Sequence, residues 1–153
     1  MTGKDVSHME QGYTSEIEVQ VMYADTDMMG VIYHGNYPKW FEMGRMQLIT
    51  DIGYDYLAME REGYYAPVYN LDITYVKALK YGDRAIVRTW VRKNTGMRTD
   101  YGVEIVNGNG ELCTYGTTTH VVVKKVDGEF KPVPFKRVFP EWFQIYETIK
   151  VDD

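Results

Sequence analysis

Hydrophobic and polar residues alternate along three separate stretches of the chain, which is the pattern of half-buried β-strands. In residues 16–23, aliphatic side chains alternate with acids and an amide. Residues 84–93 and 97–106 alternate in the same way, and an Asn-Thr-Gly turn separates them. The pattern therefore predicts three strands, the last two of which form a hairpin.

Between residues 36 and 53 the spacing of apolar side chains becomes helical. Tyr37, Phe41, Gly44 and Leu48 lie three or four residues apart, so they share one face of a helix. An Asn and a Pro at the start and a Gly after the end are typical helix boundaries. Glycine on the apolar face indicates that a strand backbone packs closely there.

The remaining segments complete a mixed pattern. Residues 66–80 and 111–126 are rich in β-branched and aromatic residues and predict two further strands. Residues 55–62 predict a short helix, and residues 140–149 predict a terminal one. The order of strand, long helix and four antiparallel strands joined by tight turns predicts an α+β fold, with one long helix against a mostly antiparallel sheet.

Composition and length are typical of one globular domain. The chain has 153 residues, of which 44% are hydrophobic and 25% are charged. We expect a single domain over residues 1–153, with the polar residues 1–12 disordered or partly a cloning remnant. No apolar run approaches the ~18 residues of a membrane span, and no secretory leader is recognisable. The single cysteine, Cys113, excludes an intramolecular disulfide, so we expect a cytoplasmic protein.

The net charge of −5 is unevenly distributed. Residues 71–100 hold seven bases and three acids, a local charge of +4, and the rest of the chain carries −9. An acidic protein with one basic stretch is unlike a nucleic-acid binder, and the stretch indicates a local anionic partner. A solvated strand face explains the same stretch equally well.

Residues 23–37 hold the densest group of candidate catalytic side chains. Asp25, Asp27 and His34 surround Gly30 in a loop that leads into the predicted long helix. A helix N-terminus offers unpaired N–H donors and a partial positive charge, which suit a developing oxyanion. A carboxylate nearby can attack an acyl carbon or activate water. Turn and capping chemistry is the simpler structural interpretation of the same acids.

Other kinds of site fit this chain poorly. The Asp-rich loop begins like a calcium loop, but Met29 and Asn36 stand where that loop needs oxygen ligands. The three histidines share no metal-ligand spacing. Neither Ser15 nor Cys113 lies in a recognisable nucleophile motif.

The pattern Y-x-D-T-D-x-x-G-x-x-Y-H-x-x-Y over residues 23–37, followed by Trp-Phe-Glu at 40–42 and by Arg45, resembles the signature of hot-dog fold acyl-CoA thioesterases. It is most similar to the 4-hydroxybenzoyl-CoA thioesterase-like subfamily, which includes the Tol-Pal-associated thioesterases. The resemblance extends over residues 16–126. It implies a single hot-dog domain, in which a five-stranded, mostly antiparallel sheet wraps the long helix.

The resemblance also implies roles for the loop residues. Asp27 matches the catalytic carboxylate of the family, which acts as nucleophile or as general base. His34 stands where the family brings a main-chain N–H to the thioester carbonyl. Gly30 allows the loop to turn, and Tyr33 lines the acyl end. Asp25 is expected to support the loop.

The implied substrate is the thioester of a small or medium acyl-CoA, which is hydrolysed to free acid and CoA. No cofactor or metal is implied, since coenzyme A is part of the substrate. The coenzyme A phosphates require bases, and Arg92, Lys93 and Arg98, which flank the predicted hairpin, are the candidates for phosphate contact.

Members of this family pair two sheets edge to edge, so the resemblance implies a homodimer or a homotetramer. Tyr101 and Val103 are among the positions expected to pack against a partner subunit. Two alternative functions remain: an acyl-ACP thioesterase that docks a carrier protein, and a non-catalytic acyl-CoA-binding hot-dog protein. The joint presence of Asp27, Gly30 and His34 disfavours the non-catalytic alternative. The acyl group and the pathway stay open.

Overall fold

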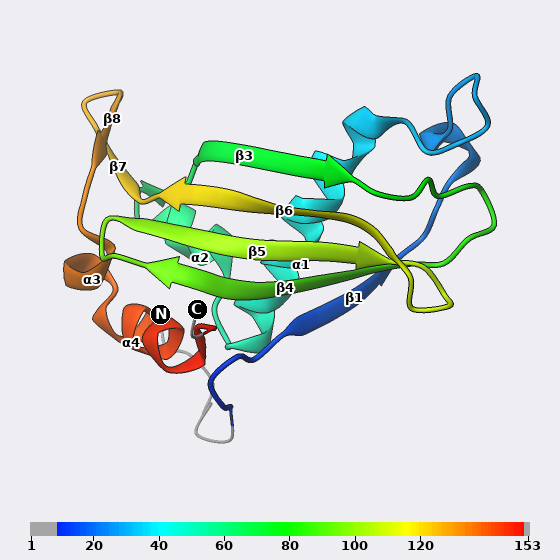
Figure 1. Cartoon of the computed structure of the whole chain (residues 1–153). Coiled ribbons are helices and arrows are strands. Elements are labelled where there is room, and N and C mark those ends of the chain that lie inside the picture. Colours follow the sequence, from blue (N-terminus) through cyan, green and yellow to red (C-terminus); the bar gives the residue numbers. More distant parts are fainter. Residues whose placement is uncertain (1–8, 152–153) are drawn as a thin grey trace.

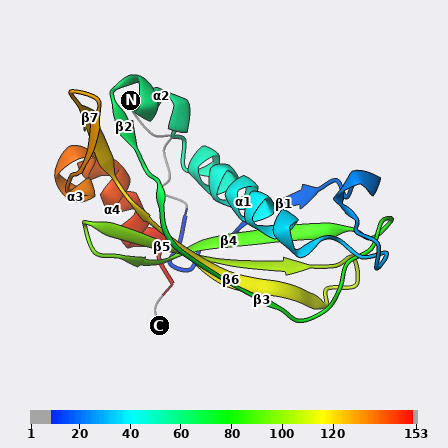
Figure 2. The same cartoon turned by 90° about the horizontal axis from the view of Figure 1, so that it is seen from above.

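The computed structural model describes residues 9–151, in which a five-stranded antiparallel sheet packs with one face against a long helix (Figures 1 and 2). The strand order is β1-β4-β5-β6-β3. The bounds are β1 Ser15–Val19, β3 Val68–Tyr75, β4 Ala85–Asn94, β5 Arg98–Val106 and β6 Leu112–Val121, and the helix is α1, Tyr37–Asp51. The predicted architecture of one long helix against an antiparallel sheet is confirmed.

Helix α1 buries the face that the sequence predicts. Tyr37, Phe41, Gly44 and Leu48 are all buried against the sheet. A Cβ atom on Gly44 would overlap Oγ1 of Thr89 and a methyl group of Val87 on β4. The close approach expected at this glycine is therefore present, but its partners are strand side chains and not the strand backbone.

The predicted last strand, residues 111–126, is two strands. The chain leaves the main sheet after β6, where the consecutive valines Val122 and Val123 are both buried and interrupt the alternation. A second, three-stranded sheet of order β2-β7-β8 follows, which the sequence analysis did not anticipate. Its strands are β2 Tyr64–Tyr65, β7 Val123–Val126 and β8 Glu129–Pro132.

Three further helices lie near the C-terminal end of α1: α2 Tyr56–Arg61, α3 Phe135–Val138 and α4 Pro140–Ile149. The predictions of α2 and α4 are confirmed. Residues 1–8 of the segment expected to be disordered lie outside the described residues. Residues 9–12 contact the fold, because Met9 packs against the aromatic cluster around α4 and the Gly12 N–H donates to the Ile149 carbonyl at 2.8 Å.

Two residues expected at a subunit interface are instead in the core. Tyr101 and Val103 are 4% and 0% exposed, because their face of β5 is the one that α1 covers. Alternation along β5 separates its two faces, but it does not say which of them meets the helix. Exposed apolar side chains lie on the edge strand β3, where Val68, Tyr69 and Tyr75 are each about half exposed.

Candidate active site

The segment between β1 and α1 forms a compact loop at one end of the sheet (Figure 1). The Gly30 N–H donates to the Asp27 carbonyl at 3.0 Å, and the Asp27 N–H donates to the Val31 carbonyl at 2.9 Å. Gly30 has a φ of 78°, a conformation that side chains other than glycine rarely adopt. The expected role of Gly30 in a tight turn therefore fits the backbone, and the turn displays Asp27.

The Asp27 carboxylate is partly exposed, and a backbone hydrogen bond orients one of its two oxygens. Its Oδ1 accepts a hydrogen bond from the Met29 N–H at 2.8 Å. Within residues 9–151, no side chain donates to this carboxylate and no cation pairs with it. One oxygen is thus oriented by the backbone, while the other is available to a substrate or a water molecule.

Asp25, two residues earlier, has the opposite environment. It is 7% exposed, and its Oδ2 accepts from the Met22 N–H at 2.8 Å. Lys39 on α1 approaches its other oxygen at 3.8 Å. The Asp25 carbonyl accepts from the Tyr33 N–H at 2.9 Å and from the Asn36 amide at 2.8 Å. These bonds tie the loop to α1 and agree with a supporting role for Asp25.

A 3₁₀ turn over His34–Asn36 leads directly into α1. Among the described residues, no acceptor is bonded to the backbone N–H of His34 or of Gly35, so both remain donors at the start of the helix. The Tyr75 hydroxyl, at the end of β3, donates to the His34 carbonyl at 2.9 Å. Burial raises the pKa of Tyr75, so its hydroxyl keeps the proton that it donates.

The side chains of Tyr33 and His34 are exposed beside this turn. Their rings lie 4.5 Å apart between centroids, and the His34 ring lies 6.2 Å from that of Tyr75. The structure thus brings Asp27, Gly30, Tyr33 and His34 together in one loop, as the sequence predicts.

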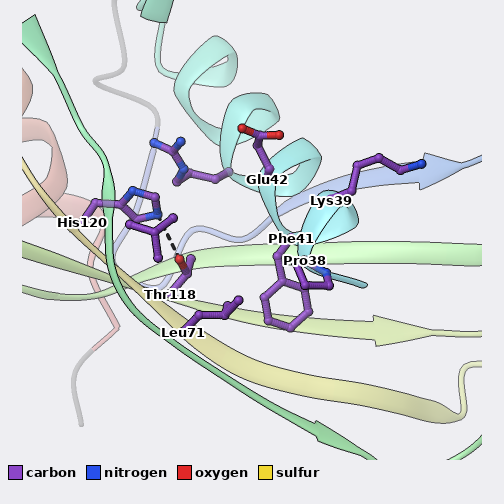
Figure 3. Close-up of a pocket in the computed structure, with 9 residues that line it drawn as sticks. Pro38, Lys39, Phe41, Glu42, Leu71, Thr118 and His120 are labelled. Carbon is purple, nitrogen blue, oxygen red and sulfur yellow. Dashed lines mark hydrogen bonds between the residues drawn. The ribbon is translucent and has the colours of Figure 1, made fainter. Parts of the chain in front are cut away.

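A pocket of about 250 Å³ opens between α1 and the strands β3 and β6 (Figure 3). Its lining includes Pro38, Phe41, Glu42 and Arg45 from α1, Leu71 from β3, and Thr118 and His120 from β6. In Figure 3, Phe41 and Leu71 border the same space, while His120 and Thr118 are joined by a hydrogen bond at one side of it. The sequence does not reveal this pocket, because α1, β3 and β6, which supply its lining, lie far apart along the chain and share no spacing pattern.

The three basic candidates do not lie near Asp27 within one chain. Val19, which precedes the loop, pairs with Ala85 at the start of β4, whereas Arg92 and Lys93 lie at the end of that strand. Ten residues of β4 separate the two ends by about 30 Å. Arg98 begins β5 at the same far end, and its guanidinium carbon lies 4.1 Å from the Tyr69 ring centroid.

No group of three or more His, Cys, Asp or Glu side chains within residues 9–151 is placed to hold a metal ion. The expectation that no metal or cofactor takes part stays a prediction. Over the same residues, no helix is long and apolar enough to cross a membrane.

The family model described as the Thioesterase-like superfamily matches residues 21–143, which include the loop, α1 and the strands β3 to β6 of the main sheet. The chain belongs to this family. Its membership confirms the resemblance to hot-dog thioesterases and the expectation of a thioester hydrolase.

Two curated relatives are similar over most of their length. The putative acyl-CoA thioesterase YneP of Bacillus subtilis is 44% identical over 138 residues, which cover 90% of this chain and 99% of the relative. The acyl-CoA thioesterase YbgC of Haemophilus influenzae is 31% identical over 121 residues, covering 78% of this chain and 86% of that protein.

Solved structures agree with the fold. The DHNA-CoA thioesterase of Staphylococcus aureus superposes with a TM-score of 0.83 at 42% identity, covering 88% of this chain and 89% of that one. A 4-hydroxybenzoyl-CoA thioesterase superposes with a TM-score of 0.74 over 86% of this chain and 97% of that one. Its 12% identity supports the shared fold alone.

Proposed function

We propose that the protein hydrolyses the thioester of a small or medium acyl-CoA to the free acid and CoA. The observation that carries this proposal is the Asp27 carboxylate, which is partly exposed and oriented by the Met29 N–H in the loop that leads to two unbonded N–H donors. The two relatives named above, both acyl-CoA thioesterases by name, add support.

In the proposed reaction, the thioester carbonyl oxygen accepts hydrogen bonds from the His34 and Gly35 N–H groups. Donors held in place at a developing oxyanion contribute about 3–4 kcal/mol each to transition-state stabilisation. The His34 imidazole is not needed for this role, because the donor is the main chain. Tyr33, beside the turn, borders the acyl end.

Asp27 supports two routes with the same products. It attacks the carbonyl carbon, the C–S bond breaks, CoA leaves as a thiolate, and water then hydrolyses the acyl anhydride on Asp27. Alternatively, Asp27 takes a proton from a water molecule whose oxygen attacks the carbonyl carbon, the C–S bond then breaks, and the CoA thiolate leaves and is protonated. A thiolate is a good leaving group, so neither route requires a strong second acid.

We also infer that a second copy of the chain completes the site. β3 is an edge strand with exposed apolar side chains, and a two-fold pairing along it would continue the sheet in antiparallel order. Such pairing would bring the Val68 end of one β3 beside the Tyr75 end of the other. Arg98 of the partner subunit would then lie near the Asp27 loop, where the CoA phosphates require a base. A homodimer, or a homotetramer built from it, and a cytoplasmic location are part of this proposal.

Release of thiol from acetyl-, benzoyl-, phenylacetyl- and palmitoyl-CoA tests the proposed activity. We expect hydrolysis of at least one of these thioesters and a decrease of about 100-fold or more in the Asp27→Asn variant. Binding of CoA thioesters without thiol release would favour a non-catalytic acyl-CoA-binding protein. Faster hydrolysis of the same acyl group on a carrier protein would favour an acyl-ACP thioesterase.

The role of Arg98 is tested with a truncated substrate. Arg98→Gln should raise KM for the acyl-CoA by about 10-fold but leave KM for the matching acyl-pantetheine, which lacks the nucleotide phosphates, unchanged. Arg88→Gln is the control, because Arg88 pairs with Glu16 and Glu104 on the outer face of the sheet. An equal change for both substrates would contradict phosphate binding by Arg98.

A further inference from the structure

The peptide group between His34 and Gly35 carries one of the two N–H donors proposed for the thioester. The carbonyl of His34 and the N–H of Gly35 belong to the same planar unit, and in a trans peptide they point in opposite directions. A group that holds the His34 carbonyl in place therefore also sets the direction of the Gly35 N–H.

Two donors hold the His34 carbonyl. The Tyr37 N–H, which closes the 3₁₀ turn, donates to it from the start of α1. The hydroxyl of Tyr75, the last residue of β3, donates to it from the sheet at 2.9 Å. A carbonyl oxygen has two lone pairs, so these two bonds use both of them. The peptide is thus held through its carbonyl, while its N–H points the other way and stays available to a ligand.

The main sheet fixes the position of Tyr75. Its backbone pairs with Thr114 of β6, and its ring meets the ring of Tyr37 edge-on at 5.3 Å between centroids. Tyr37 is itself 3% exposed, so it is a firm support for the Tyr75 ring. The hydroxyl therefore reaches the loop from a rigid element, which is how a polar group is held in one geometry without being ordered during a reaction.

The ring of Tyr33 limits the same peptide from another side. A Cβ atom on Gly35 would overlap this ring, so only glycine fits beneath it. The peptide cannot move towards the Tyr33 ring without a clash, and the Tyr75 hydroxyl holds its carbonyl. These two tyrosines, from the loop and from β3, together restrict the orientation of the Gly35 N–H.

The bond from Tyr75 also changes the strength of this donor. A hydrogen bond to an amide oxygen draws electrons towards that oxygen and makes the amide N–H a better donor, so bonds in such a chain strengthen one another. The chain here would run from the Tyr75 hydroxyl through the peptide to the thioester oxygen. The gain is greatest when that oxygen carries the negative charge of the tetrahedral intermediate.

We propose that Tyr75 is a positioning residue for thioester hydrolysis, which acts through the His34–Gly35 peptide by orienting and polarising its N–H. Tyr75 does not have to touch the substrate for this role. The inference rests on the proposed function, and it adds a residue of β3 to a mechanism otherwise confined to the loop before α1.

Tyr75→Phe tests this role, because it removes the hydroxyl and keeps the ring. For the thioester that the native protein hydrolyses fastest, we expect kcat to fall by about 3- to 10-fold. KM should stay within about 2-fold, since the bond acts mainly on the transition state. The melting temperature and the number of subunits should not change.

Tyr115→Phe is the matched control. Tyr115 is 46% exposed, close to the 49% of Tyr75, and it lies on the neighbouring strand β6. Its side chain faces the outer side of the sheet, where it lines a groove with Trp90. Loss of this hydroxyl should leave kcat and KM unchanged.

Infrared spectroscopy of a bound thioester tests the same role without turnover. The tightest-binding of the four acyl-CoA thioesters named above carries a heavy carbon isotope at its thioester carbonyl, and it is bound to Asp27→Asn and to Asp27→Asn/Tyr75→Phe. A hydrogen bond to a carbonyl lowers its stretching frequency. We therefore expect the labelled band at a higher frequency in the double variant.

Several results would overturn the proposal. They are an unchanged kcat in Tyr75→Phe, an equal loss in Tyr115→Phe, or the same carbonyl band in both Asp27→Asn proteins. A loss of kcat that accompanies a lower melting temperature or separated subunits would assign Tyr75 a structural role instead. A native protein that binds these thioesters without hydrolysing them would contradict the proposed function, while the carbonyl band would still show whether Tyr75 acts on the donor. Binding of none of the four would contradict both.

Discussion

The two ends of helix α1 have opposite surroundings. At its N-terminal end, Met28 and Met29 are almost fully exposed and the Asp27 carboxylate is partly exposed. At its C-terminal end, Leu48 and Ile52 are fully buried in a cluster of aromatic side chains from α3, α4 and the adjoining loops. The comparison indicates that one end of the helix supplies stability, while the other displays polar groups that substrate can reach.

The polar groups at the N-terminal end of α1 depend on the stability that the C-terminal end supplies. Unbonded N–H donors and a lone carboxylate do little to stabilise a fold, but they suit an oxyanion and an acyl carbon. The aromatic cluster anchors α1 and so holds the start of the helix in place relative to the loop. Variants at the two ends should therefore separate stability from activity.

The largest effect on stability is expected at the aromatic end. Phe135 is 4% exposed, and its ring centroid lies between 5.7 and 6.1 Å from those of Trp142, Phe143 and Tyr146. Phe135→Ala should lower the free energy of unfolding by about 3–5 kcal/mol, as measured by denaturant titration. The Phe135→Ala variant, where it is folded, should retain the kcat of the native protein for thioester hydrolysis.

The matched control for this variant is Phe130→Ala on β8. Phe130 is 57% exposed, so its loss should cost about 1 kcal/mol or less. Equal losses for the two phenylalanines would contradict the assignment of stability to the aromatic cluster.

An effect of intermediate size is expected at His120, between the two ends. Its pKa is lowered to about 4 in the folded state, mainly by burial, from an ordinary value of 6.5. Between these values the unfolded chain binds more protons, so stability is complete above pH 6.5 and is lost as the pH falls towards 4. The loss is on the order of 3 kcal/mol. His120→Asn should have a shallower dependence of unfolding free energy on pH in this window, and an identical slope in both proteins would exclude His120 as the cause.

The smallest effect concerns the contact between α1 and β4. Gly44→Ala would place a methyl group against Thr89 and Val87, at a cost of about 1–3 kcal/mol. Alanine recovers about 1 kcal/mol of helix propensity, so we expect a net loss of about 1 kcal/mol. Adding Thr89→Ala should recover part of it in a double-mutant cycle. Stabilisation by Gly44→Ala alone would show that the helix can shift away from the sheet.

Helix α1 and the loop before it could be predicted because their signals are local. Apolar spacing places α1 within 36–53, and the structure has it at Tyr37–Asp51. The second sheet was missed because β2 has two residues and the strands β7 and β8 are mostly exposed, so alternation is weak there.

The remaining gaps arise from information that lies outside any single segment. Arg45 and His120 lie 75 positions apart in the sequence, and only the fold brings them to one pocket. The basic stretch was detected by its charge, but charge alone did not tell which end of the sheet Arg98 occupies. For the same reason, Tyr101 was expected at a partner although it packs beneath α1.

The central claim is that Asp27 performs chemistry while Asp25 supports the loop. The most direct test measures kcat for thiol release and the melting temperature of Asp27→Asn and Asp25→Asn side by side. We predict that Asp27→Asn loses about 100-fold or more in kcat at an unchanged melting temperature, whereas Asp25→Asn loses mainly thermal stability. Full activity in Asp27→Asn, or a greater loss of kcat in Asp25→Asn, would contradict the account.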